Sequence, residues 1–113
     1  MDSGKITIDA DELEKHIEEL GAIGLDPETG GVVRLLYTPA WHQAVEKMRA
    51  WMDEAGLETW LDAVGNLHGR LTGREVGPVV MTGSHIDTVV QGGKYDGALG
   101  MSAKKNLLFG VEL

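Results

Sequence analysis

Apolar residues recur at helical spacing in two stretches of the chain, and the first of them begins near the N-terminus. Its apolar face consists of Leu13, Ile17 and Leu20. Asp9 stands before this face as a candidate N-cap, and Glu12, three residues later, is its capping-box partner. We therefore predict a helix that begins after Asp9 and ends or frays at Gly21 or Gly24.

The second helical stretch has the stronger start signal. Thr38 is a candidate N-cap, and Pro39 occupies the first helical position, where its missing N–H has no partner to lose. The apolar stripe that follows consists of Trp41, Val45, Met48, Met52 and Ala55. Gly56 lies just past the end of the stripe. Because Met and Trp prefer the interior, we interpret this stripe as core rather than as a cofactor contact.

Strand patterns follow these helices. Residues 57–62 alternate between two faces, and residues 66–71 read as the returning strand. The continuous apolar run at 78–81 is typical of a buried central strand, which would end at Gly83. Helices and strands together predict an α/β fold. Ligand sites in open α/β sheets lie beyond the carboxyl ends of strands, so we expect the functional residues in the loop that starts at Ser84.

Composition limits the kinds of partner. The 113 residues suffice for one domain, and 42% hydrophobic with 25% charged residues is ordinary for a folded protein. A net charge of −8 argues against nucleic acid and against an anionic membrane surface as partners. There is no cysteine, so any metal must be held by His, Asp or Glu. We expect a cytoplasmic protein, since no signal peptide or membrane span is evident.

The loop after the apolar run, GSHIDTVVQGGKYDG, gathers the candidate chemistry. Spacing of two puts His85 and Asp87 on the same side of an extended segment. Asp87 could orient the imidazole, as carboxylates behind ligating histidines do. Asp96 follows a Gly92-Gly93 turn that can fold the chain back, and its two oxygens could bridge two metal ions. This donor set suits Zn²⁺, Mn²⁺ or Fe²⁺.

The spacing of His85, Asp87 and Asp96 does not by itself exclude simpler interpretations of these residues. A histidine in a loop is more often an ordinary polar residue, and aspartates in glycine-rich loops often form turns. A phosphate-binding loop is disfavoured, because neither nucleotide-binding glycine pattern occurs here and two aspartates repel an anion. The remaining histidines have no matching carboxylate pattern, and we interpret them as surface or structural residues. They are His16, His42 and His68.

GSHIDTVVQGGKYDGALG resembles the first metal-binding segment of the amidase/hydantoinase/carbamoylase group of zinc-peptidase-like metallohydrolases. The upstream sequence GGVVRLLYTPAWHQAVEKMRAWMDEAGLETWLDAVGNLHGRLTG is similar to the N-terminal region of the same family. Its part WMDEAGLETWLDAVGNLHGR resembles the allantoate-hydrolysing branch. The resemblance covers roughly residues 12 to 101, and the motifs are specific in combination.

The resemblance assigns roles to three residues of this loop. It implies that His85 is the first metal-ligand histidine and that Asp96 is the metal-bridging aspartate. It implies that Asp87 is the aspartate that supports the histidine, and we place Asp87 with the catalytic residues. Substrate-binding residues stay unassigned.

The resemblance also implies a fold and a reaction. The family's catalytic domain is a three-layer α/β/α structure with a mixed sheet, as in aminopeptidases, and it carries an inserted domain for dimerisation. Its members hydrolyse C–N bonds of ureido or N-carbamoyl compounds as homodimers with two divalent ions, Mn²⁺ or Zn²⁺. The metals polarise the carbonyl and activate a water, and a glutamate acts as general base.

This chain departs from that family in its length. The expected general base, the remaining ligands and the dimerisation domain fall after its last residue, so we expect residues 1–113 to be the N-terminal part of a catalytic domain. Lys104, Lys105 and Gly110 stand where an apolar helix is expected. We hypothesise a truncated or frameshifted product without measurable activity and with weak metal binding.

Two alternatives complete the sequence-based picture. The substrate class fits allantoate, converted to ureidoglycine, ammonia and carbon dioxide, but an N-carbamoyl-L-amino-acid hydrolase or a β-ureidopropionase shares the ureido group. A protein of another class, a non-catalytic interaction fragment, would use exposed tryptophans to associate with a partner. The tryptophans are Trp41, Trp51 and Trp60.

Overall fold

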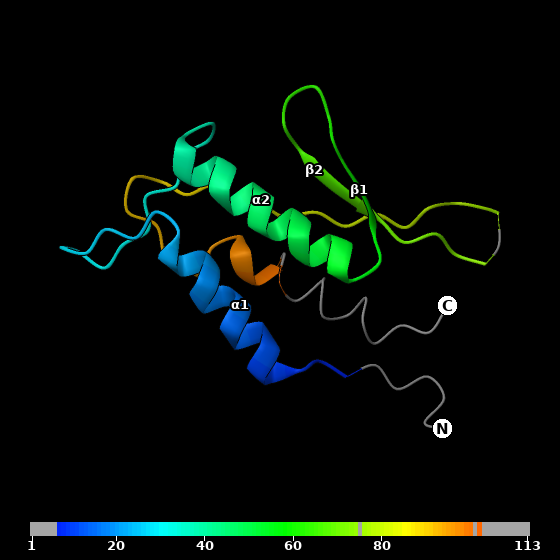
Figure 1. Ribbon diagram of the computed structural model, residues 1–113, viewed down its shortest axis with the longest axis horizontal. Coiled ribbons are helices and arrows are strands. Elements are labelled where there is room, and N and C mark those ends of the chain that lie inside the picture. The colour runs from blue at the N-terminus through cyan, green and yellow to red at the C-terminus, as the bar shows by residue number, and fades with distance from the viewer. Residues whose placement is uncertain (1–6, 75, 101, 103–113) are drawn as a thin grey trace.

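The computed structural model describes residues 7–74, 76–100 and 102. Their elements, in chain order, are α1 (Ala10–Ala22), α2 (Pro39–Glu54), β1 (Glu58–Leu61) and β2 (Leu67–Arg70). The two helices lie alongside each other, and the strands form a hairpin beside α2 (Figure 1). The α/β class expected from the sequence is confirmed. Among the described residues, no helix is long and apolar enough to cross a membrane.

Helix α1 begins where the capping signal predicts. The Asp9 carboxylate accepts a hydrogen bond from the backbone N–H of Glu12 at 3.0 Å, which satisfies one of the free donors of the first turn. The helix ends at Ala22, and Gly24 then adopts a φ of 84°, a conformation that glycine allows. The buried residues of α1 are His16, Ile17, Leu20 and Gly21.

Helix α2 forms the centre of the core. Thr38 caps it through a hydrogen bond from the Trp41 N–H to Thr38 Oγ1 at 3.3 Å. Its buried residues are Trp41, Ala44, Val45, Met48, Trp51 and Met52. The predicted stripe is confirmed and is wider than expected, because Trp51 turns toward α1 and stacks on His16 with ring centroids 4.0 Å apart.

The hairpin is confirmed to within one residue at each end. β1 and β2 pair antiparallel, with Glu58 opposite Arg70 and Leu61 opposite Leu67. The turn between them is organised by Asp62, whose carboxylate accepts hydrogen bonds from backbone N–H groups within the turn. The hairpin packs closely on α2, since a Cβ at Gly69 would lie 3.0 Å from the sulfur of Met52.

Two segments far apart in the sequence lie side by side beyond the end of α1. Val32 and Gly92 exchange two backbone hydrogen bonds of 2.8 Å each. Beyond Gly92 the chain folds back, as predicted, because the Ser84 hydroxyl donates to the carbonyl of Gly97. Two residues further along, the N–H of Thr88 donates to the carbonyl of Arg34 at 2.8 Å. These bonds hold the loop that carries the candidate site against the body of the molecule (Figure 1).

The buried central strand predicted at 78–81 is wrong for this structure. Val79, Val80 and Met81 are 63%, 97% and 79% exposed and belong to no sheet. A buried strand needs neighbouring strands for its N–H and C=O groups. Within the described ranges, only β1 and β2 pair as a sheet, so this run has no neighbour. The tail positions Lys104, Lys105 and Gly110 lie outside the described residues.

Candidate metal centre

Burial alternates along the segment that carries the histidine. Ile86 and Thr88 are buried, whereas the side chain of His85 is 52% exposed and that of Asp87 is 44% exposed. Ile86 belongs to the same core cluster as Met48 and Trp41. An extended segment with its even-numbered residues in the core turns the histidine and the aspartate outward on one side, as their spacing predicts.

Gly97 brings the third residue to the same place. Its φ is 72°, and a Cβ at this position would lie 2.0 Å from the carbonyl oxygen of His85. Only glycine permits that conformation together with that approach. The Ser84 hydroxyl donates to the Gly97 carbonyl at 3.0 Å, and Ala98 is fully buried just beyond. Asp96 is therefore held opposite His85.

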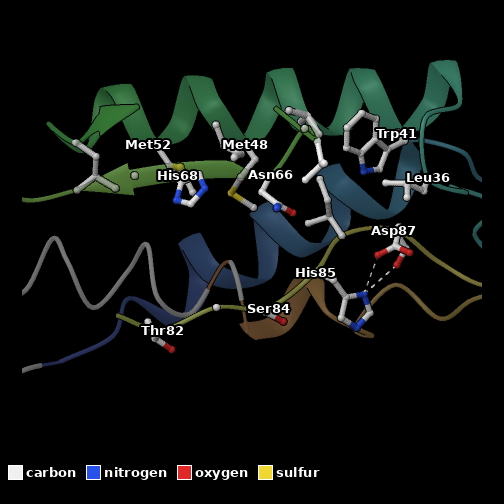
Figure 2. Close-up of a pocket in the computed structure, with 18 of the residues that line it drawn as sticks. Leu36, Trp41, Met48, Met52, Asn66, His68, Thr82, Ser84, His85 and Asp87 are labelled. Atoms are coloured by element: carbon white, nitrogen blue, oxygen red, sulfur yellow. Dashed lines mark hydrogen bonds and ion pairs between the residues drawn. The ribbon is translucent and has the colours of Figure 1, made fainter. Parts of the chain in front are cut away.

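The hydrogen bonds of His85 define the state of its ring. Nδ1 lies 3.1 Å from the carbonyl oxygen of Asp87 and 3.3 Å from its carboxylate (Figure 2). Both partners can only accept, so Nδ1 donates to them, and in the Nδ1–H tautomer of the ring Nε2 carries the lone pair. Nε2 faces Oδ1 of Asp96 at 3.5 Å. Two acceptors that face each other call for a cation between them, either a proton or a metal ion.

This geometry fits a pair of metal ligands. Two ligands at ordinary zinc distances in a tetrahedral arrangement are separated by about 3.4 Å. The separation from Nε2 to Asp96 is 3.5 Å, which is longer than a good hydrogen bond and close to that value. No third His, Asp or Glu completes a ligand cluster within the part of the chain that the structure describes. The described residues thus provide two candidate ligands and one carboxylate that could support the histidine.

A pocket of about 560 Å³ lies beside this pair, between α2, the hairpin and residues 81–87. Its walls include Trp41, Met48 and Met52 from the helix and His68 from β2. Figure 2 shows the methionines projecting from α2 toward the segment that carries His85. A mostly apolar pocket with a few polar groups is typical of a small-molecule site.

The remaining histidines have the structural roles expected of them, although not all lie at the surface. His16 is buried against Trp51. His42 is exposed and packs edge-on against Trp41. His68 lies 3.1 Å from the Asp62 carboxylate, and the hydrogen bonds from His68 and Asn66 lower the pKa of Asp62.

Arg34 is a site residue that the sequence-based interpretation did not single out. It is completely buried, and its Nε donates to the carbonyl of Ile86 at 2.7 Å, between His85 and Asp87. Burial lowers the pKa of Arg34, whereas the negative charge of Asp87 raises it. The available signal was a lone arginine in the apolar run VVRLLY, because arginine is almost never fully buried unless paired.

The fold and the site define an α/β segment with a histidine held between two carboxylates on a glycine-rich loop. No protein-family model matches the chain. Individual proteins do match the chain. The chain is 48% identical over 92 residues to allantoate amidohydrolase from Escherichia coli (strain K12), and the match covers 80% of this chain and 22% of that enzyme. It is 44% identical over 99 residues to N-carbamoyl-L-amino-acid amidohydrolase from Pseudomonas sp. (strain NS671), covering 87% and 24%.

Solved structures agree with these relatives. A hydantoinase/carbamoylase family amidase from Burkholderia ambifaria superimposes with a TM-score of 0.86 at 34% identity, covering 91% of this chain and 25% of that one. By sequence and by fold, the chain is similar to one part of these amidohydrolases and of the hydantoinase/carbamoylase family of amidases. It spans about a quarter of the length of the relatives it matches.

Proposed function

We propose that His85 and Asp96 are ligands of a divalent metal centre that hydrolyses a ureido C–N bond. The observation that carries this proposal is Nε2 of His85 facing the Asp96 carboxylate at 3.5 Å. Asp87 supports the assignment, because its carbonyl and carboxylate hold the proton on Nδ1 and so keep Nε2 available.

In this reaction, the residues of this chain would bind the metal ion and orient the imidazole ring that holds it. A bound metal ion supplies Lewis-acid polarisation of the carbonyl and lowers the pKa of a water. His85 and Asp96 hold the ion, Asp87 fixes the ring, and the pocket beside them excludes water from the apolar side. Because each ion normally needs more protein ligands than these, the complete centre takes further ligands from beyond the described residues.

Allantoate is the substrate we favour. The E. coli relative is named for allantoate, and its identity to this chain, 48%, exceeds the 44% of the N-carbamoyl-L-amino-acid relative. Hydrolysis of allantoate would give ureidoglycine, ammonia and carbon dioxide. An N-carbamoyl-L-amino acid or β-ureidopropionate is the alternative. We propose Mn²⁺ or Zn²⁺ as the two ions, a homodimer as the active assembly and the cytoplasm as its location.

Metal titration tests the site itself. We expect Zn²⁺ or Mn²⁺ to bind this chain weakly, and His85→Ala or Asp96→Asn to weaken that binding at least tenfold. His42→Ala is the matched control, because His42 is an exposed histidine that contacts Trp41 rather than a carboxylate. Equal loss in all three variants would show nonspecific binding and would contradict the proposed ligand pair.

A chimera tests the reaction. The matching segment of the E. coli relative is replaced by the corresponding residues of this chain, and products are identified by mass spectrometry. We expect hydrolysis of allantoate to persist and to fall at least a hundredfold when Asp96 is changed to Asn. The His42→Ala chimera should keep its activity. A folded, metal-loaded chimera that acts only on N-carbamoyl amino acids would favour the alternative substrate.

A second candidate function rests on the exposed apolar run. Val79, Val80 and Met81 favour a non-catalytic segment that associates with another polypeptide. The tryptophans give this idea less support than expected, because Trp41 and Trp51 are each only 7% exposed, against 41% for Trp60. In a Trp60→Phe variant, emission typical of buried indole would confirm that the helices form a self-contained core. Emission typical of exposed indole would favour a segment that folds with its partner.

A further inference from the structure

The side chain of Arg34 joins helix α1 to the candidate site through hydrogen bonds. Its Nη1 donates to the carbonyls of Leu20 at 2.7 Å and Ile23 at 3.0 Å, and its Nε donates to that of Ile86 at 2.7 Å. The side chain therefore ties the C-terminal end of α1 to the peptide between His85 and Asp87.

The charge of Arg34 also suits this place. Free carbonyls at the end of a helix carry partial negative charge, and α1 has no basic residue in its own last turn. Arg34 supplies that cation from elsewhere in the sequence. On its other side lies the negative charge of Asp87, which acts on the guanidinium. The carbonyls are direct partners of the buried charge and Asp87 acts on it electrostatically, while Nη2 is buried without a hydrogen-bond partner among the described residues.

The backbone of Arg34 also forms hydrogen bonds with the segment that carries His85 and Asp87. Its N–H donates to Oγ1 of Thr88 at 2.8 Å, and its carbonyl accepts from the N–H of Thr88 at 2.8 Å. Oγ1 of Thr88 in turn donates to the carbonyl of Val32 at 3.1 Å. Residues on both sides of Asp87 are thus fixed by one buried arginine and its neighbours, which leaves Asp87 little freedom.

We propose that Arg34 is a positioning residue that sets the Asp87–His85 hydrogen bonds and so keeps Nε2 directed at Asp96. The fork of the guanidinium allows it to reach both α1 and Ile86 at once, which a lysine cannot do. The inference rests on the proposed function only in treating Nε2 as the metal-facing nitrogen. The arrangement of the ring itself is a property of the metal-free chain.

The test reads the His85 ring by ¹⁵N NMR without metal and then measures Zn²⁺ affinity. In the wild-type chain, the Nδ1–H tautomer should dominate. In Arg34→Met, we expect the ring to shift toward the Nε2–H tautomer and Zn²⁺ affinity to fall about tenfold to a hundredfold. Arg34→Lys should show a smaller change of the same kind, and it replaces Arg34→Met if that variant fails to fold.

Arg49→Met is the matched control. Arg49 is a partly buried arginine whose side chain bonds to one residue, Thr59, and it supports the hairpin rather than the His85 segment. It should lower stability and leave the His85 tautomer and Zn²⁺ affinity within twofold. A folded Arg34 variant with an unchanged His85 tautomer would overturn the inference, as would an equal change in Arg49→Met.

The two proposals can fail separately. A wild-type chain that binds no Zn²⁺ at His85 would contradict the metal site, while the metal-free tautomer would still decide the role of Arg34. Zn²⁺ binding that depends on His85 but is indifferent to Arg34, with an unchanged tautomer, would leave the metal site standing and remove the positioning role.

Discussion

At the scale of single residues, the separation of the two candidate ligands depends on a glycine. The backbone at Gly97 lies so close to His85 that a Cβ would meet both the carbonyl oxygen, at 2.0 Å, and Nδ1, at 2.8 Å. The lack of a side chain at Gly97 thus determines how near Asp96 can come to the imidazole.

We predict that Gly97→Ala will push the two ligands apart. The positive φ alone costs about 1–2 kcal/mol for a residue with a Cβ, and the clash adds to this. Gly30→Ala is the control, since Gly30 has a φ of 75° with open space around its Cβ position. Urea unfolding and Zn²⁺ titration should show a larger loss for Gly97→Ala in both measurements. Equal losses would mean that the close approach is unimportant.

A second substitution tests whether the carboxylate of Asp87 contributes to Zn²⁺ affinity. Asp87→Asn keeps the backbone carbonyl that accepts from Nδ1 of His85 but removes the charge behind the ring. We predict that Zn²⁺ affinity falls about tenfold to a hundredfold. Asp62→Asn removes the carboxylate beside the other pocket histidine, His68, and should leave Zn²⁺ affinity unchanged. If both variants weaken binding equally, the effect comes from net charge.

At the scale of elements, the hairpin turn is tied together by one carboxylate. Asp62 accepts hydrogen bonds from His68, Asn66 and the N–H of Val64, and these lower its pKa below the ordinary value of 3.8. Because the folded state binds fewer protons than the unfolded state, this contribution to stability is complete above about pH 4 and is lost as pH falls further.

The hairpin should therefore loosen in acid in a way that depends on Asp62. Trp60 stacks on His68 with ring centroids 5.1 Å apart, so the ring-current shifts of the His68 protons report on the turn. Between pH 5 and pH 2, we expect these shifts to move toward unfolded values in the wild-type chain. In Asp62→Asn, they should already be displaced at pH 5 and change little. A wild-type titration that is identical in the variant would assign the effect to another group.

The elements that local signals specify are the ones that sequence analysis could predict. The caps at Asp9 and Thr38 fix both helix starts, and alternation with a five-residue turn fixes the hairpin. The strand prediction around Val79–Met81 was wrong because a continuous apolar run forms a buried strand only beside neighbouring strands. The sequence pattern does not show whether such neighbours are present. The glycine turn allowed the sequence to predict that His85 and Asp96 lie close together. The hydrogen bond from Arg34 to the carbonyl of Ile86 joins residues too far apart in the sequence for a local pattern to predict it.

At the scale of the whole molecule, the exposed apolar run Val79–Met81 lies in a long stretch without regular structure. Residues 76–84 are all exposed and lack regular structure. We predict that thermolysin, which cleaves before bulky apolar residues, cuts first at Val79, Val80 or Met81. Mass spectrometry of early fragments checks this. First cuts within α2 would indicate that the core itself opens readily.

The number of ligands sets the expectation for catalysis. The proposed pair His85 and Asp96 would supply two ligands where a metal centre needs more, so we predict that these 113 residues release no measurable ammonia from allantoate. A coupled ammonia assay with added Mn²⁺ or Zn²⁺ measures this. Turnover that disappears in Asp96→Asn would prove the expectation wrong and would show that the chain completes its own centre.

The long reach of the contacts around Thr88 has a consequence for the order of folding. The hairpin and helices close over short distances in sequence, whereas Arg34 meets Thr88 across 54 positions and Gln91 meets Asp26 across 65. Closing a long loop costs more entropy than closing a short one, so we expect these contacts to form after those of the helices and the hairpin. During synthesis, the helices and the hairpin can begin to form before the His85 segment has been made. A metal ion would then meet a scaffold already built, rather than serve as the nucleus around which it forms.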